Sequence, residues 1–596
     1  MNRTLQQGIV RSALWAAYGD ILGFPTELVD EDGLKRRIGT SKISQATGWK
    51  RLIGGHFGVW AMLNAGTYSD DTQLRLATSR SIRGDGHFDV ETFAKIELPV
   101  WLSYCLGAGR GSKLGATMLG QRGVNWFSNF FDQRAVRYVD GGGNGAAMRI
   151  QPHVWASTDL GIAETYIPDV IRNSLCTHGH PRGISGAVIH AACLAAVLHE
   201  SKIPVPTDWV DLVLYIELAQ KFIFEDPELS TFWLPTWEQK AGRSFSEEME
   251  KVKLEWIQDV EKCLPLLNQD PKIAYASVVQ MLGGFDDNSR GSGIKCALFA
   301  LVAAWCFREM PTENGLVIVA NLLSSDTDTI GTMAGALLGA IASSEPLDIV
   351  QDKKYITIEA KRLHAISRGE IVESFQYPDL MTWQAPRTQL DTVGSIGAQL
   401  AFAGLGLIER CSEEFVSSKA DYSYQWFKLE FGQTILCKRR IKIDEMDAKA
   451  LPAIISPLKT YNPPTDLEKV RARVPLHTRD MFDATNTPVN DDLTSNLKIA
   501  ASIKKSAVSD LEIAKTKHVD EPQNNNINGD VPLHLNKYEY SIDELTDIAI
   551  KSGFDVSIIG NDLLELAERQ NGIELAISYA AIVVKARRAR LQRGKV

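Results

Sequence analysis

The spacing of apolar and polar residues changes along the chain. Through residues 1–370 apolar residues recur at helical spacing, and no series of alternating strands is evident there. Residues 424–443 (YQWFKLEFGQTILCKRRIKI) alternate instead and contain a glycine turn, which is typical of strands. Residues 456–536 contain prolines, the segment QNNNINGD and little apolar pattern. Helical spacing then returns behind a capping box that begins at Ser541.

These changes predict four parts. At 596 residues the chain is too long for a single core. We expect an all-α domain over residues 1–370, a small α/β extension over 371–455, a disordered linker over 456–536, and a helical segment with a basic tail over 537–596. The last part should hold helices at 562–570 and 573–590.

Composition and charge indicate an ordinary globular protein. Hydrophobic residues make up 44% and charged residues 23% of the chain, and the net charge of −9 does not indicate general binding to nucleic acid. The basic run from Lys585 to Lys595 is more often a solvated helix end, and contact with nucleic acid or an acidic partner is the minority interpretation.

Cysteine usage and the apolar runs bear on location. The eight cysteines form no C-x-x-C pair, which favours reduced core residues. The N-terminus lacks the apolar region of a signal peptide, and runs such as Cys296–Phe307 fall short of the roughly 18 residues that a membrane span needs. The prediction is a cytoplasmic protein without membrane contact.

The chemistry centres on residues 321–340, NLLSSDTDTIGTMAGALLGA, which read as the start of a buried helix. Ser324 and Ser325 are the expected N-caps. Asp326 and Asp328 point about 200° apart on a regular helix, so they converge on one ligand only where the backbone is still irregular. A helix cap with acidic residues near the helix dipole is the alternative for such a cluster taken alone.

A second cluster repeats this chemistry. Residues 66–78, GTYSDDTQLRLAT, place Ser69, Asp70, Asp71 and Thr72 at the start of an expected amphipathic helix. Hydroxyls with paired carboxylates suit hard cations such as Mg²⁺ or Mn²⁺, and two ions can share four aspartates where one rarely needs them. The pair of clusters therefore predicts a dinuclear site.

Two further segments carry weaker signals. A helix over residues 5–18 is expected to end at Gly19, so Asp20 and Glu27 lie in a turn, as a cap and a surface acid or as a loop that holds Glu27 near the metals. Residues 28–65 look like irregular surface.

The segment 140–149, DGGGNGAAMR, is expected to form either a flexible loop or a loop whose backbone N–H groups bind phosphate oxygens. The predicted helix end at His178 places its ring as a cap or against a ligand.

Together these segments resemble the ADP-ribosylglycohydrolases. The motifs GDILGFPTE, GTYSDDT, GGGNGAAMR with a later THGHP, and SSDTDTIGTMAGALLGA occur in the family's order over residues 8–345. The resemblance implies an all-helical catalytic domain with two Mg²⁺ ions, or Mn²⁺, at the base of an ADP-ribose cleft. It covers about the first 370 residues.

The resemblance also implies site residues. The metal ligands would be Ser69, Asp70, Asp71, Asp326, Asp328 and Thr329, with Glu27 adjacent. The diphosphate would lie on Gly141, Gly142, Gly143, Asn144 and Gly145, with His178 along the ligand. Glu27 and Asp71 are the candidates to orient or deprotonate a water that attacks the distal ribose.

The expected activity is removal of ADP-ribose from a protein side chain, with arginine as the first acceptor to consider. Two alternatives stay open: a hydrolase acting on ADP-ribosylated nucleic acid or a small molecule, and a non-catalytic ADP-ribose-binding scaffold. The sequence does not indicate an oligomeric state. The long extension fits a specialised target, with a regulatory or toxin-antagonising role as a guess from architecture.

Overall fold

The computed structural model describes residues 4–55, 58–133, 136–417, 421–452, 541–568 and 572–592. The predicted linker over residues 456–536 lies outside the described residues.

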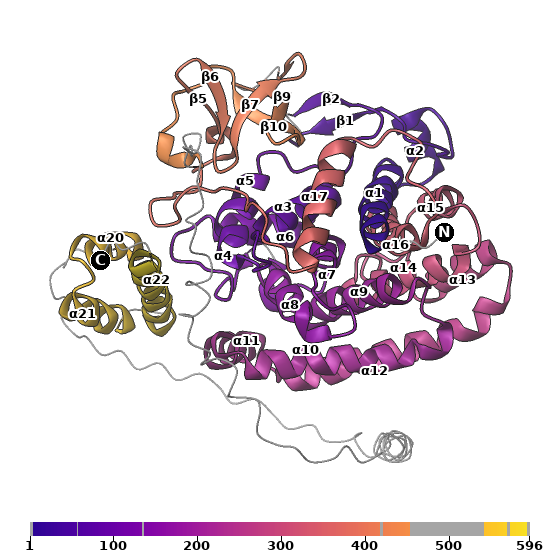
Figure 1. Ribbon diagram of the computed structural model, residues 1–596, viewed down its shortest axis with the longest axis horizontal. Helices are drawn as coiled ribbons and strands as arrows, with labels where there is room; N and C mark the ends of the chain where they lie inside the picture. Colours follow the sequence, from indigo (N-terminus) through magenta and orange to yellow (C-terminus); the bar gives the residue numbers. More distant parts are fainter. Residues whose placement is uncertain are drawn as a thin grey trace, which may run out of the picture. The chain divides into compact units, whose positions relative to one another are not determined.

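Two helices in direct backbone contact form the centre of the helical domain (Figure 1). They are α1 (Leu5–Gly23) and α16 (Thr327–Ile341). A Cβ atom added to Gly19 would lie 2.0 Å from the carbonyl oxygen of Gly331, so only glycine allows this approach. The prediction that the first helix ends at Gly19 is therefore wrong: this glycine is a packing contact inside a longer helix.

Further helices surround this pair and share its core. They are α2 (Glu31–Ile38), α3 (Asp70–Ser81), α4 (Val90–Thr92), α5 (Leu98–Trp101), α6 (Arg110–Leu119), α7 (Gln151–Trp155), α8 (Ile167–Leu175), α9 (Pro181–Glu200), α10 (Val213–Glu225), α11 (Leu234–Ala241), α12 (Phe245–Cys263), α13 (Pro271–Met281), α14 (Gly293–Phe307), α15 (Thr312–Ala320) and α17 (Lys353–Ser367).

The domain is rich in helices but not purely helical. The segment expected to be irregular surface contains α2 and an antiparallel hairpin of β1 (Trp49–Ile53) and β2 (Val59–Leu63). Along β2 buried and exposed residues alternate, which is the period of a half-buried strand. Two-residue strands β3 (Asp132–Gln133) and β4 (Val136–Arg137) also pair. The all-α prediction needs this correction, because five-residue strands leave only a short alternation in the sequence.

The extension contains the predicted strands. An antiparallel sheet has the order β10-β9-β7-β6-β5, with β8 also paired to β9. Its strands are β5 (Val393–Ile396), β6 (Gln399–Phe402), β7 (Gly406–Arg410), β8 (Phe415–Val416), β9 (Tyr422–Leu429) and β10 (Thr434–Arg440). The regular helical elements described between residues 371 and 452 are two short 3₁₀ turns, Gln389–Asp391 and Ala448–Ala450.

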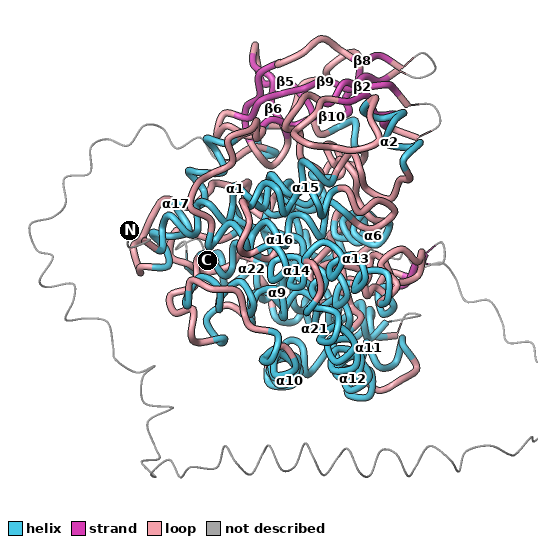
Figure 2. Tube along the Cα trace, turned by 90° about the vertical axis from the view of Figure 1, so that its right-hand side faces the viewer, coloured by secondary structure: helices cyan, strands magenta, loops and turns pink. Residues whose placement is uncertain are grey.

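The sheet shares a hydrophobic cluster with the β1–β2 hairpin. Trp426 and Tyr424 of β9 pack with Trp49 and with Phe24, the residue that follows α1. The Trp426 indole also donates a hydrogen bond to the Met62 carbonyl at 3.2 Å. Figure 2 shows these strands side by side. The extension therefore supports the segment that leads from α1 into the candidate site.

The C-terminal segment is helical, as predicted. Its helices are α20 (Ile542–Lys551), α21 (Val556–Ala567) and α22 (Gly572–Gln592), packed around a small core of their own. The capping box is present: Ser541 accepts from the Glu544 amide, and the Glu544 carboxylate accepts from the Ser541 amide.

Helix α9 is long and apolar enough to cross a membrane by length and composition, contrary to the expectation that no apolar run reaches that length. Of its apolar window, 89% is buried inside the protein, so it serves as a core helix here. All eight cysteines are free thiols, and most are buried.

Candidate active site

The first acidic cluster forms where α16 begins. Asp326 precedes the helix with non-helical dihedrals (φ −84°, ψ 73°), and Asp328 lies in the first turn. The predicted serine caps are wrong: Ser325 donates to the Leu322 carbonyl, and Ser324 adopts a left-handed conformation (φ 68°). The irregular backbone at Asp326 lets both aspartates converge, as the sequence requires.

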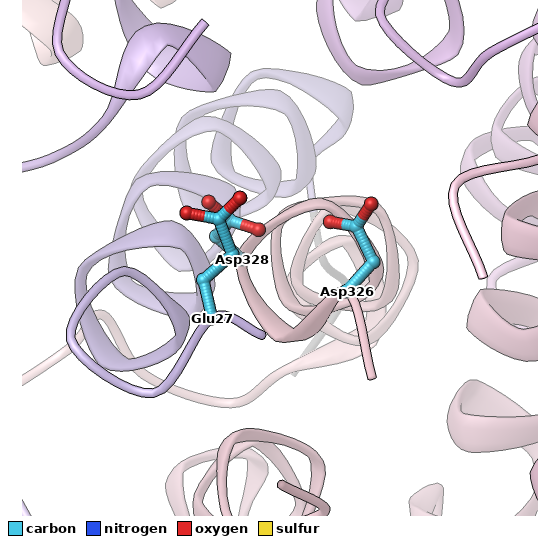
Figure 3. A group of neighbouring side chains, drawn as sticks. All are labelled: Glu27, Asp326 and Asp328. Atoms are coloured by element: carbon cyan, nitrogen blue, oxygen red, sulfur yellow. The ribbon is translucent and has the colours of Figure 1, made fainter. Parts of the chain in front are cut away.

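Glu27 joins these two aspartates from the loop after α1. Carboxylate oxygens of Glu27, Asp326 and Asp328 all lie within 4.8 Å of one another, and the side chains point to the same side (Figure 3). The loop is tied to α16, because Thr26 Oγ1 donates to Thr327 Oγ1 at 2.9 Å. Glu27 is thus positioned beside the cluster and is not a plain surface acid.

The second cluster caps α3. Ser69 Oγ accepts from the Asp71 amide at 3.2 Å and donates to Asp71 Oδ2 at 3.1 Å. Asp70 Oδ1 accepts from the Ala108 amide at 2.7 Å. Asp71 Oδ1 is buried with no hydrogen-bond partner among the described residues. Every residue of α3 is buried, so the expected amphipathic helix is a core helix instead.

Asp20 fixes the second cluster in place, a role that the sequence did not reveal. It lies inside α1, where its carboxylate accepts from the Ser69 amide at 2.9 Å, the Thr72 amide at 3.0 Å and Thr72 Oγ1 at 2.5 Å. The interpretation of Asp20 as a turn cap is wrong. An acidic residue within an otherwise apolar helical stretch was the available signal.

Four carboxyl groups in and beside the two clusters have raised pKa values. Burial, followed by the charge of Asp326, raises the pKa of Glu27 to about 7, and burial followed by the charge of Glu27 raises the pKa of Asp70 to about 7. Burial and the neighbouring carboxylates also raise the pKa of Asp71 and of Asp328. Like charges in a desolvated site need a cation before all of them ionise.

The glycine loop, residues 141–145, adjoins the first cluster and is fixed by backbone hydrogen bonds. The Asn144 amide donates to the Gly291 carbonyl at 3.0 Å, and the Gly293 amide donates to the Gly142 carbonyl at 2.9 Å. Asn144 Nδ2 donates to Asp326 Oδ2 at 2.9 Å. The loop therefore meets the acidic cluster on its Asp326 side.

His178 lies directly against the glycine loop. A Cβ atom added to Gly145 would come within 2.9 Å of the His178 ring. The Nδ1 atom of His178 is 2.8 Å from Thr177 Oγ1. Burial, with the nearby charge of Arg149, lowers the pKa of His178 to about 3, so the ring is neutral at neutral pH.

Comparison with known proteins identifies the family of this chain. The sequence profile described as ADP-ribosylglycohydrolase matches residues 2–364. The chain belongs to the ADP-ribosylglycohydrolase family.

Two relatives that match by sequence agree with this membership. The ADP-ribosyl-[dinitrogen reductase] glycohydrolase of Rhodospirillum rubrum is 31% identical over 181 residues, which is 30% of this chain and about half (52%) of that protein. The ADP-ribosylhydrolase ARH3 of Xenopus tropicalis is 23% identical over 297 residues, which is 48% of this chain and 75% of that protein. A solved ADP-ribosylglycohydrolase-related protein complex is 18% identical with a TM-score of 0.38, covering 61% of this chain and 99% of that one.

In this member of the family, the structure brings most of the predicted site residues to one place. Glu27, Asp326 and Asp328 converge, and Asp70 and Asp71 are electrostatically coupled to them. Thr329, predicted as a ligand, is buried in the first turn of α16, where its Oγ1 donates to Met148 Sδ at 4.0 Å. Gly141, Gly142, Gly143, Asn144 and Gly145 form the adjoining loop with His178. The sequence did not reveal the role of Asp20 in holding the second cluster. It also did not reveal Arg37 and Arg51 beside Glu27, because their segment was expected to be irregular surface.

Proposed function

We propose that this ADP-ribosylglycohydrolase is a metal-dependent enzyme that hydrolyses the glycosidic bond between ADP-ribose and a modified protein side chain. One observation carries the proposal. Three carboxylates from two separate elements have oxygens within 4.8 Å of one another, and a glycine loop adjoins them through Asn144. Carboxylates beside a phosphate-binding loop suit a sugar attached to a diphosphate.

Two Mg²⁺ ions are the proposed cofactors, with Mn²⁺ as the alternative. The residues fit such ions, because the buried carboxyl groups have raised pKa values and Asp71 Oδ1 has no hydrogen-bond partner among the described residues. The ions would be held by Ser69, Asp70, Asp71, Asp326, Asp328 and Thr329. When bound, they would supply Lewis-acid polarisation of the ribose hydroxyls and of a bound water.

The chain's own groups would orient the substrate and move the proton. Backbone N–H groups of residues 141–145 would hold the diphosphate, and the neutral His178 ring would lie along the ligand. Glu27 or Asp71 would orient the attacking water and take its proton. The transition state has oxocarbenium character, so a carboxylate-rich site beside the sugar stabilises it.

A protein acceptor is supported by the Rhodospirillum rubrum relative, which is named for a protein substrate, dinitrogen reductase. Arginine is the acceptor that the sequence first indicated.

The test is release of free ADP-ribose from arginine-modified and serine-modified proteins, before and after metal depletion with EDTA. We expect release that stops on depletion and returns with added Mg²⁺. Tight ADP-ribose binding without release from any substrate would favour the scaffold alternative instead. Metal-independent release would contradict the proposed cofactors.

A further inference from the structure

The acceptor side of the site follows from the chemistry of the ribose, and this step rests on the proposed function. In a ribofuranose the anomeric carbon and the carbon that bears the diphosphate arm flank the ring oxygen, so their substituents point away from each other. The glycine loop meets the acidic cluster at Asp326, and Glu27 lies on the other side (Figure 3). With the diphosphate on the loop, the acceptor leaves the ribose toward Glu27.

Two arginines lie on that side. Arg37 of α2 donates from Nη1 to the Pro25 carbonyl at 2.9 Å and to the Glu27 carbonyl at 3.1 Å. The guanidinium carbon of Arg51, on β1, is 4.6 Å from the centre of the Phe24 ring. Both guanidinium carbons also lie over the Trp49 ring, at 5.3 and 5.5 Å. We call Arg37, Trp49 and Arg51 the acceptor shelf.

The charges of Arg37 and Arg51 act on the nearby Glu27 carboxylate and lower its pKa, opposing the rise that burial causes. Neither Arg37 nor Arg51 forms an ion pair with a described carboxylate, although both are half-buried. By contrast Arg80 pairs with Glu97 and Arg172 pairs with Asp226. Half-buried guanidinium groups without a carboxylate suit an anion from outside the chain, because they hold two parallel donors at fixed geometry.

We propose that the acceptor shelf binds an acidic protein segment that flanks the ADP-ribosylated residue. An arginine acceptor would bring a third guanidinium to Arg37 and Arg51, and like charges disfavour that approach. The shelf therefore favours an acceptor without positive charge, such as a serine hydroxyl, next to aspartate or glutamate. This choice replaces arginine as the first acceptor to test.

The outward face of the same hairpin favours a protein over a nucleic acid. Leu52, Trp60 and Met62 are 41%, 65% and 39% exposed and lie together on adjacent strands. An exposed apolar face suits apolar side chains of a protein partner. A polyanion would instead need many phosphate contacts, and the shelf offers only two guanidinium groups.

The test uses three peptides that carry ADP-ribosyl-serine and differ only in flanking glutamate, lysine or alanine. For the full-length protein with Mg²⁺ at low salt, we expect kcat/KM to be roughly tenfold higher with glutamate than with lysine, the size of one hydrogen bond to a charged group. Arg51→Gln should remove most of that preference and Arg51→Lys should restore part of it. Lys221→Gln is the control, because Lys221 is an exposed cation on α10, outside the hairpin.

The outcomes separate the two proposals. Equal rates on the three peptides, or the same preference in Arg51→Gln as in the wild type, would overturn the shelf while leaving the hydrolase intact. Faster release from a modified DNA end than from every peptide, lost in Arg51→Gln, would overturn the choice of a protein. No release from any substrate, including the alanine peptide, would instead overturn the proposed function.

Discussion

At the scale of single residues, the acidic site is marked by the raised pKa values of Glu27 and Asp70. Glu27 and Asp70 titrate near neutral pH because burial and neighbouring carboxylates penalise their ionised forms. The sequence could place Asp326, Asp328, Asp70 and Asp71 in helix starts, since their spacing requires it. It left Glu27 open between a surface acid and a residue near the metals, and it took Asp20 as a turn cap, because their partners lie on α16 and α3, far along the chain.

These raised pKa values predict how the stability of the metal-free protein depends on pH. The folded pKa of about 7 for Glu27 and Asp70 exceeds the ordinary values of 4.5 and 3.8, so the folded state binds more protons than the unfolded state between those limits. Tm in EDTA should therefore fall as pH rises from about 4 to about 7, and added Mg²⁺ should reduce the fall. Melting curves across that range test this, and a flat or rising Tm would contradict it.

Among the elements, the contact of α1 with α16 sets the position of both acidic clusters. The sequence predicted a buried helix at α16 but took Gly19 as a stop, because a glycine that permits backbone contact looks the same as one that ends a helix. The hairpin β1–β2 was missed for a related reason. Its inward residues pack on the aromatic residues of β9, and nothing in the local sequence marks that partner.

Gly19→Ala tests this contact. The new Cβ would meet the Gly331 carbonyl oxygen at 2.0 Å, so the helices must separate, and we expect a loss of about 1–3 kcal/mol in the free energy of unfolding. ADP-ribose release should fall with it, since Glu27 and Asp328 would move apart. Gly111→Ala, which meets no atom within 4 Å, is the control for urea unfolding. Equal stability of the two variants would argue against the contact.

Across the whole molecule, the extension and the helical domain depend on one another. The strand pattern of residues 424–443 was predictable, but its packing on Phe24 and Trp49 was not, because such contacts depend on the tertiary fold. The family match ends at residue 364, and the sheet that follows supports the loop before Glu27.

Trp426→Ala should reveal that dependence. Removing a buried indole costs about 3–5 kcal/mol of unfolding free energy, and the loss should also loosen the hairpin that carries Arg51. Stability by chemical denaturation and ADP-ribose release should both decrease. Trp60→Ala, on the exposed face of the hairpin, should leave stability nearly unchanged. Full stability of Trp426→Ala would mean that the sheet is not a support.

A metal centre at Asp326 and Asp328 is tested most directly by ADP-ribose release, at saturating Mg²⁺, by the wild type and by the Asp326→Asn, Asp328→Asn double variant. We expect a loss on the order of 10³-fold or more, because the variant keeps the shape of the site and removes two charges that would hold the cations. Glu309→Gln, which removes an exposed charge, should behave as the wild type. Full activity in the double variant would contradict a metal centre built on these aspartates.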